Sequence, residues 1–396
     1  MRHIKLISAI LIISLVWLPF VSIPLARGEA GVTENEIVVG SILDLSGHLA
    51  FLGNEILNGS NFYLNYINER GGIHGRKIKM IVEDDRTQPP FTLAAAKKLI
   101  ERDRVFCLFI SLSQVGTDSI IPIMEEKRIP LVCPVSQNSG VYTPPKRYIF
   151  HFNASTEIQG RGAIEVIVKV LNKKDAKIGC LIQDDLYGQD IMKGVKSWTQ
   201  KYGIQLTNVE TYRRGSMDFS PQLQKLRGAE AKFVILATIT RETVQVFKQS
   251  KDIGYDPQFI GPSATTEPLI VKLAGETAEG FIGMNFIEWD YEGFEPGRLY
   301  LSLKKKVEPD RPDSFYKRAG FFWAMALVEA LDRAGKNLTR DGLVAALEGF
   351  KNYTAGGLCA PITFGPHRRQ GMTSLYFLQV KNGKFVRISD WIDLSK

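Results

Sequence analysis

Residues 36–85 have the sequence EIVVGSILDLSGHLAFLGNEILNGSNFYLNYINERGGIHGRKIKMIVEDD, and this stretch decides the fold class. It opens with a short apolar run at 37–43, which is typical of a buried parallel strand. A polar loop follows at 44–53, and apolar residues then recur at helical spacing up to Arg70, where two glycines end the predicted helix. A second strand is predicted at 77–82. This pattern predicts a βαβ unit, and the loop after its first strand is the first candidate wall of a ligand pocket.

The same residues, in the order IVVG, DLSGHLAFLG, NG and YINERGGIHGRKIKMIVEDD, resemble the amino-terminal signature of the periplasmic leucine/isoleucine/valine-binding protein family. Members of that family are the solute-binding subunits of branched-chain amino-acid ABC importers. The match is specific in order and spacing, and further segments extend it over nearly the whole chain after residue 30. The resemblance implies a type I periplasmic-binding fold, in which two lobes close on a small ligand.

The beginning of the chain has the features of a secretory signal. Basic residues precede an apolar run at 6–20, and small residues follow around Ala30. Because the run is short for a membrane span, we expect cleavage near Ala30 and an exported chain in the periplasm or another extracytoplasmic compartment. An uncleaved anchor is the alternative, since residues 21–25 could extend the apolar run.

Charge and length limit the class of protein. The 396 residues carry a formal net charge of +8, but the cations are scattered along the chain. The densest run, at 304–306, is typical of a solvated helix face, so no nucleic-acid partner is expected. The length that remains after residue 30 is sufficient for two domains, each with its own core.

Predicted strands and helices alternate in two series. Pro144-Pro145 break the first series, a short strand leads away from it, and the second series begins at Ile158. The first series continues with helices at 91–101 and 117–126 and strands at 105–110, 129–134 and 148–152. The second series has helices at 158–171, 188–202, 219–228, 241–252 and 267–274 and strands at 177–182, 205–211, 232–237 and 258–260. This repetition predicts an α/β protein with two doubly wound lobes.

The last third departs from the simple alternation. Helices are predicted at 298–306, 314–334 and 340–349, and strands at 281–289, 362–364, 375–380 and 385–391, with Asn382-Gly383 as a hairpin signal. By resemblance, the chain returns to the first lobe near residue 285 and to the second near residue 355, so that three strands form a hinge. The implied lobes are 31–152 plus about 285–354, and 153–284 plus about 355–396.

Four cysteines, at 107, 133, 180 and 359, form no close pair and lie away from histidines. No metal or cofactor site is therefore predicted. Three of the cysteines lie inside apolar strands, which favours buried thiols. Cys107 and Cys133 are on strands predicted to be neighbours, so they are the pair to test for a disulfide.

Candidate ligand contacts in the first lobe lie in loops that follow strands, at 46–53, 111–116 and 135–139. The sequence SLSQVG at 111–116 ends a strand and precedes a helix, so its side chains and backbone N–H groups could hold a carboxylate. Ordinary helix capping explains Ser113 equally well. The resemblance favours ligand contact, because family members usually fix the ligand's carboxylate from this loop and the next. The implied contacts are Ser113 or Gln114, and Ser136 or Gln137.

In the second lobe, the sequence IQDDLYGQD at 182–190 resembles the family's D…YG element, in which the tyrosine closes over the ligand. The resemblance thus implies a ligand contact from Tyr187. This residue follows a strand and starts a helix, a position from which an aromatic ring can stack into a cleft. A surface tyrosine over a hydrophobic seam is the alternative.

This chain departs from the family pattern where amino-acid binders pair the ligand's ammonium group. Members generally place an acidic residue two positions after the Gly-Pro pair, but here Gly261-Pro262 is followed by Ser263 and then Ala264. Glu267 could reach in instead, although its position at a helix start explains it more simply. A buried ammonium group without a charged partner is costly. We therefore expect a ligand with a carboxylate or amide on an apolar or aromatic body, with amino acids as the alternative.

Two further departures make the predicted pocket more apolar. Ile239 stands where an aromatic residue is common in the family. Leu52, with Phe51 adjacent, stands where many members have tyrosine. These residues complete the set of predicted ligand contacts.

The predicted function is binding rather than catalysis. No G-x-S-x-G, H-E-x-x-H, Walker or G-x-G-x-x-G sequence occurs, and the histidines are dispersed without ligand spacing. We expect a monomer that captures a small molecule between its lobes and delivers it to the permease subunits of an ABC importer. The alternative is a soluble ligand sensor that hands its closed form to a membrane signalling partner.

Overall fold

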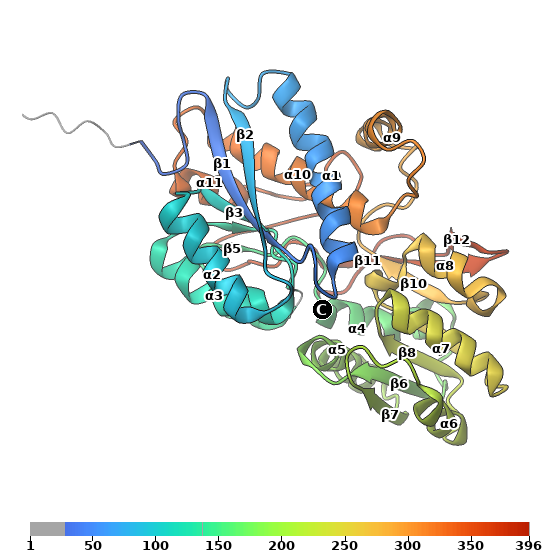
Figure 1. The fold of residues 1–396 in the computed structure, drawn as a ribbon. Coiled ribbons are helices and arrows are strands. Elements are labelled where there is room, and N and C mark those ends of the chain that lie inside the picture. Colours follow the sequence, from blue (N-terminus) through green and yellow to red (C-terminus); the bar gives the residue numbers. More distant parts are fainter. Residues whose placement is uncertain (1–27, 137, 396) are drawn as a thin grey trace, which may run out of the picture.

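Two β-sheets divide the chain into two lobes, and helices cover both faces of each sheet (Figure 1). The computed structural model describes residues 28–136 and 138–395. Each lobe has three layers, which are helix, sheet and helix. This confirms the predicted α/β class with two doubly wound lobes.

The first sheet has the strand order β2-β1-β3-β4-β5, and all its neighbouring strands are parallel. β1 lies between β2 and β3, and Val39 and Ile42 on its two faces are fully buried. Burial on both faces is why this strand is a continuous apolar run rather than an alternating one. The strands are β1 (Glu36–Leu43), β2 (Lys77–Asp84), β3 (Cys107–Ser111), β4 (Leu131–Val132) and β5 (Ile149–Phe150).

The helices of the first lobe come from two distant parts of the sequence. One face of the sheet is covered by α2 (Pro89–Lys97), continued by η1 (Lys98–Arg102), and α3 (Gln114–Lys127). The other is covered by α1 (Ala50–Glu69), α10 (Phe315–Ala334) and α11 (Arg340–Glu348), with α9 (Glu295–Val307) beside them. The backbones of α1 and α10 touch, since a Cβ on Gly59 would lie 1.8 Å from the carbonyl oxygen of Lys317.

The second sheet has the order β12-β11-β10-β9-β8-β6-β7, and β13 pairs with β11. Its central strands are parallel, whereas β11 runs antiparallel to β10 and β12. The strands are β6 (Ile178–Gln183), β7 (Leu206–Tyr212), β8 (Phe233–Ala237), β9 (Gln258–Gly261), β10 (Ile282–Asn285), β11 (Ser374–Lys381), β12 (Lys384–Arg387) and β13 (Ile392–Asp393).

Helices again cover both faces of the second sheet (Figure 1). One face carries α4 (Thr156–Glu165), continued by η3 (Val166–Val170), and α5 (Leu186–Tyr202). The other face carries α6 (Ser220–Gly228), α7 (Thr240–Asp252) and α8 (Pro268–Ala274). Short turns complete the chain, namely η2 (Ser139–Val141), η4 (Ser263–Thr265) and η5 (Gly275–Ala278).

Most predicted elements are present, and the differences are local. The hairpin forms at Asn382-Gly383, where both residues have positive φ, at 52° and 70°. The loop predicted at 44–53 is shorter, because α1 already begins at Ala50. The strand predicted at 362–364 is wrong, since Ile362 makes only an isolated bridge to Tyr353. The strand predicted at 385–391 is reduced to β12.

The four cysteines are free and buried, and burial raises the pKa of the Cys107 and Cys180 thiols to about 12. This agrees with buried thiols and gives no disulfide between Cys107 and Cys133. Among the described residues, no helix is both long and apolar enough to span a membrane. Of the signal predicted at 1–30, residues 1–27 lie outside the described residues.

Candidate functional site

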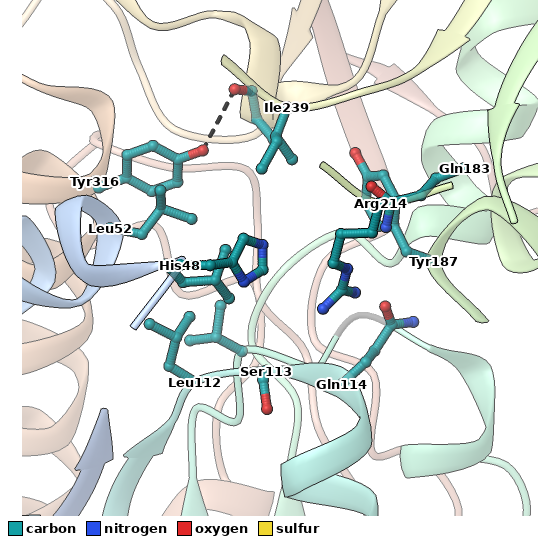
Figure 2. Close-up of a pocket in the computed structure, with 13 residues that line it drawn as sticks. His48, Leu52, Leu112, Ser113, Gln114, Gln183, Tyr187, Arg214, Ile239 and Tyr316 are labelled. Carbon is teal, nitrogen blue, oxygen red and sulfur yellow. Dashed lines mark hydrogen bonds between the residues drawn. The ribbon is translucent and has the colours of Figure 1, made fainter. Parts of the chain in front are cut away.

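A pocket lies between the two lobes, and both sheets point the carboxyl ends of their strands at it (Figure 2). Among the described residues, its lining is mostly apolar with a few polar groups, as small-molecule sites commonly are. The lining residues are His48, Leu49, Leu52, Leu112, Ser113, Gln114, Val135, Gln183, Tyr187, Arg214, Ile239, Ala264 and Tyr316.

Sheet topology explains why the pocket lies here. In the first sheet β1 pairs with both β2 and β3, so the strand order reverses beside β1. The loops after β1 and β3 carry His48 and Ser113 to the pocket. In the second sheet β6 pairs with both β7 and β8, and the loops after β6 and β8 carry Tyr187 and Ile239. Crevices at such switch points are the ligand sites of open α/β sheets, and here two of them face each other.

The polar end of the pocket in the first lobe is the start of α3. Ser113 caps this helix, its hydroxyl oxygen accepting a 3.2 Å hydrogen bond from the Gly116 N–H, and its φ is 120°. A positive φ in a non-glycine residue is strained and is often found at functional sites. The side-chain nitrogen of Gln114 is buried and has no hydrogen-bond partner among the described residues. The start of α3 can therefore hold an oxygen of a ligand.

In the second lobe, the ring of Tyr187 lines the pocket from the first turn of α5. Asp185 caps α5 by accepting hydrogen bonds from the N–H groups of Tyr187 and Gly188. The same carboxylate accepts a 2.5 Å hydrogen bond from the Gln183 side chain and pairs with Arg214 at 2.6 Å. These contacts fix the loop from which Tyr187 lines the pocket.

Two basic side chains reach the pocket from opposite lobes. Arg214 lies in the loop after β7, and Figure 2 shows its guanidinium group between His48 and Gln114. Burial, and then the charge of Arg214, lower the pKa of His48 below its ordinary value of 6.5. His48 is therefore neutral at pH 7, and Arg214 is the charged group on this wall.

One hydrogen bond closes the pocket across the lobes. The hydroxyl of Tyr316, in α10, donates to the carbonyl oxygen of Ala264, after β9, at 3.3 Å; the dashed line in Figure 2 marks it. The ring of Tyr316 is packed edge-on by Phe51, with centroids 6.3 Å apart. Tyr316 therefore forms a wall that contacts both lobes.

Glu267 does not line this pocket. It lies at the start of α8, where its carboxylate accepts hydrogen bonds from the Ser314 hydroxyl at 3.2 Å and the Phe315 N–H at 3.1 Å. This carboxylate is committed to the start of α10, and it lines a neighbouring cavity with Phe51. No group of three or more potential metal ligands is close enough to hold an ion within the part of the chain that the structure describes.

A family model described as periplasmic binding protein matches residues 36–384. The chain belongs to the periplasmic binding protein family. This match, together with relatives named Leu/Ile/Val-binding proteins, confirms the resemblance seen in the sequence. The family is extracytoplasmic and binds solutes.

Relatives of this periplasmic binding protein share about a quarter of its sequence. A leucine-, isoleucine-, valine-, threonine- and alanine-binding protein of Pseudomonas aeruginosa is 25% identical over 74% of this chain and 77% of its own. Leu/Ile/Val-binding protein homolog 8 of Brucella abortus is 22% identical over 89% of this chain and 90% of its own.

Solved structures confirm the type I periplasmic-binding fold. A branched chain amino acid ABC transporter protein of Thermus thermophilus with bound valine superposes with a TM-score of 0.82 at 22% identity, covering 91% of this chain and 97% of its own. A fatty acid ABC transporter substrate-binding protein of Thermomonospora curvata also gives 0.82, at 20% identity over 93% and 95%. The fold therefore accompanies ligands of different chemistry.

The structure brings five of the predicted contacts of this binding protein into the lining of one pocket, three from the first lobe and two from the second. These are Leu52, Ser113, Gln114, Tyr187 and Ile239. Gln137 lies outside the described residues.

Three predicted contacts do not line the pocket, each for a physical reason. Phe51 is next to Leu52 in the first turn of α1, so it points about 100° away, toward α8. Ser136 is fully buried and donates to Asp118 at 3.3 Å. Ser263 is 1% exposed, and its backbone N–H donates to Gln159 at 2.8 Å.

Sequence reasoning missed four polar pocket residues. His48 lay in the first candidate loop, and Gln183 directly follows the strand predicted at 177–182, so position alone could have indicated both. Arg214 followed a predicted strand within RRGSMDFSPQLQKLR, but a basic residue after a strand is usually solvated. Tyr316 comes from a helix that returns from the far end of the sequence, and no local signal indicates it.

Proposed function

We propose that this periplasmic binding protein captures a small carboxylate or amide with an apolar or aromatic body and delivers it to an ABC importer. The observation that carries the proposal is the meeting of two topological switch points at one pocket. A site built from both lobes is what capture by closure requires. The solved structure described as a branched chain amino acid ABC transporter supports the importer as the destination.

The pocket chemistry supports the ligand class. The start of α3, at Ser113 and Gln114, can hold a carboxylate or amide oxygen, and Leu52, Ile239 and Tyr187 offer apolar contact area. None of the described lining residues is acidic, so an ammonium group would lack a charged partner. This favours acids and amides over leucine, isoleucine and valine.

Closure would follow from contacts that the ligand makes with both lobes at once. Such a ligand stabilises the closed state by its differential affinity for it. We assign the moving bodies to residues 31–152 plus about 285–354, and 153–284 plus about 355–396. The packing of α10 on α1 and the pairing of β11 with β10 support this division.

The cleavage site, the compartment, the oligomeric state and the partner are part of the same proposal. The signal is cleaved near Ala30, the mature chain is a periplasmic monomer, and its partners are permease subunits. In support, Gly31 is already part of the fold, because its carbonyl oxygen accepts a 2.7 Å hydrogen bond from the Val38 N–H. Binding without catalysis is the activity proposed, as the family is one of solute-binding proteins.

A thermal-shift screen of amino acids, aromatic carboxylates and amides, followed by calorimetry, tests the proposed ligand class. Bound ligand raises the melting temperature by mass action. We expect 4-methyl-2-oxopentanoate or an aromatic acid to bind at least about 10-fold more tightly than leucine, since a buried unpaired ammonium costs more than 1.4 kcal/mol. Submicromolar leucine binding without any response to the acids would contradict the proposal.

A further inference from the structure

Arg214 reaches the pocket from the second lobe, yet its side chain extends toward the first. It follows β7, its side chain is 39% exposed, and Figure 2 shows its guanidinium group pointing to the end of the pocket formed by Ser113 and Gln114. One terminal nitrogen of the guanidinium group pairs with Asp185 at 2.6 Å. Because a guanidinium has five N–H donors, this contact fixes Arg214 and leaves other donors for the pocket.

Two carboxylates beside these basic groups, Asp44 and Asp185, already have partners within the protein. Asp44 accepts from the Gly47 N–H at 2.5 Å, the Leu49 N–H at 2.9 Å and the Thr87 hydroxyl at 2.5 Å. Asp185 caps α5 and pairs with Arg214, as described above. Neither lines the pocket, so the charge offered to a ligand is that of the guanidinium group.

We propose that one ligand carboxylate is held from both lobes, by Ser113 and Gln114 on one side and by Arg214 on the other, and that Arg214 selects the acid over its neutral amide. This inference rests on the proposed function and narrows its ligand class from acids and amides to acids. Charge-assisted hydrogen bonds are about twice as strong as neutral ones, so the guanidinium favours the anion. An ammonium group in the same place would meet a like charge.

A carboxylate shared between the lobes also makes Arg214 part of closure. When the lobes separate, Arg214 moves away with the second lobe while Ser113 and Gln114 stay on the first. The charge-assisted contact therefore exists only in the closed form, and the ligand shifts the population toward that form. Acids should consequently close the protein more completely than amides do.

Glu242 is the competing acceptor for an ammonium group. It lies in the first turn of α7, it is 4% exposed, and one of its carboxylate oxygens has no partner among the described residues. It does not line the pocket. Amino-acid binding that depends on Glu242 is therefore an outcome that the test must detect.

The experiment compares acids with their amides, using 4-methylpentanoate and 3-phenylpropanoate against 4-methylpentanamide and 3-phenylpropanamide. Calorimetry measures each dissociation constant for the wild type, for Arg214→Gln and for Arg213→Gln. Arg213 is the matched control, because it is the adjacent, exposed arginine of the same loop and does not line the pocket. Thermal unfolding without ligand verifies that each variant is folded.

We expect Arg214→Gln to weaken acid binding by about 10- to 100-fold, the range for a hydrogen bond to a charged group, and to change amide binding by less than about 3-fold. Arg214→Lys, which keeps the charge, should retain a preference for the acid, and Arg213→Gln should behave as wild type. Scattering should report a larger contraction with acids than with amides in the wild type.

Each other outcome overturns the inference in a different way. Equal loss for acids and amides in Arg214→Gln, or equal loss in Arg213→Gln, removes the role of Arg214 and leaves the proposed function standing. Tight leucine binding that Glu242→Gln abolishes assigns the pocket to an amino acid. If no acid or amide binds to the wild type, the proposed ligand class fails and this inference fails with it.

Discussion

The hydroxyl of Tyr187 donates a 3.3 Å hydrogen bond to the carbonyl oxygen of Thr238, which follows β8 in the same lobe. The proton of this hydroxyl is therefore used within the second lobe. What Tyr187 offers to the pocket is mainly its ring, held over the cleft by the bond to Thr238 and by the helix cap at Asp185. This relationship separates the contribution of the ring from that of the hydroxyl.

Tyr187→Ala should weaken binding of a carboxylate ligand strongly, whereas Tyr187→Phe should keep most of it. The alanine variant loses the stacked area, which costs about 2–4 kcal/mol at an aromatic contact of this kind. The phenylalanine variant loses one internal hydrogen bond, about 1 kcal/mol. Calorimetry with the best acid from the screen measures both. Unchanged affinity in Tyr187→Ala would remove this residue from the site.

Gln114→Leu should affect binding and stability with opposite signs. The side-chain nitrogen of Gln114 is buried without a partner among the described residues, so a leucine there should leave the melting temperature of the ligand-free protein equal or higher. The same change removes a donor from the ligand and should lower affinity by about 1–2 kcal/mol. Gln200→Leu, on the exposed side of α5, is the control. Parallel losses of stability and affinity would indicate a structural role instead.

The sequence could predict those features that local chemistry determines. The apolar run of β1 indicated a strand buried on both faces, and the loops after strands indicated where Ser113 and Tyr187 would lie. Leu52 and Phe51 could not be separated, because their difference is one step of helical rotation at the start of α1.

Other residues reach the pocket through packing between distant parts of the chain, which no local sequence pattern indicates. Tyr316 reaches the pocket because α10 packs on α1, and those helices are more than 240 residues apart in the sequence. Arg214 reaches it because a long side chain extends between two lobes whose spacing only the assembled fold sets. The sequence showed that no acidic residue follows Gly261-Pro262. It did not show that Arg214 brings a positive charge to the same pocket.

The contact between Glu267 and the start of α10 should make stability depend on pH. Glu267 is 1% exposed, and burial raises the pKa of its carboxyl to about 7, while its hydrogen bonds from Ser314 and Phe315 oppose the rise. Asp313 and Glu55 add to the rise, and Lys272 and Arg311 line the same cavity. In the unfolded chain the carboxyl returns to its ordinary value of 4.5. Between these two pKa values the folded state therefore binds more protons than the unfolded state.

The sign of the effect follows from this difference in bound protons. Stability from Glu267 is fully present below the unfolded pKa and is lost as the pH rises through the folded pKa. Relative to Glu267→Gln, which cannot ionise, the wild type should lose up to about 3 kcal/mol of unfolding free energy between pH 4.5 and pH 7.5. Urea unfolding at a series of pH values measures both proteins, and Glu276→Gln, an exposed glutamate after α8, is the control. Parallel curves for wild type and Glu267→Gln would show that the carboxyl stays ionised when buried, and that the hydrogen bonds from α10 outweigh its desolvation.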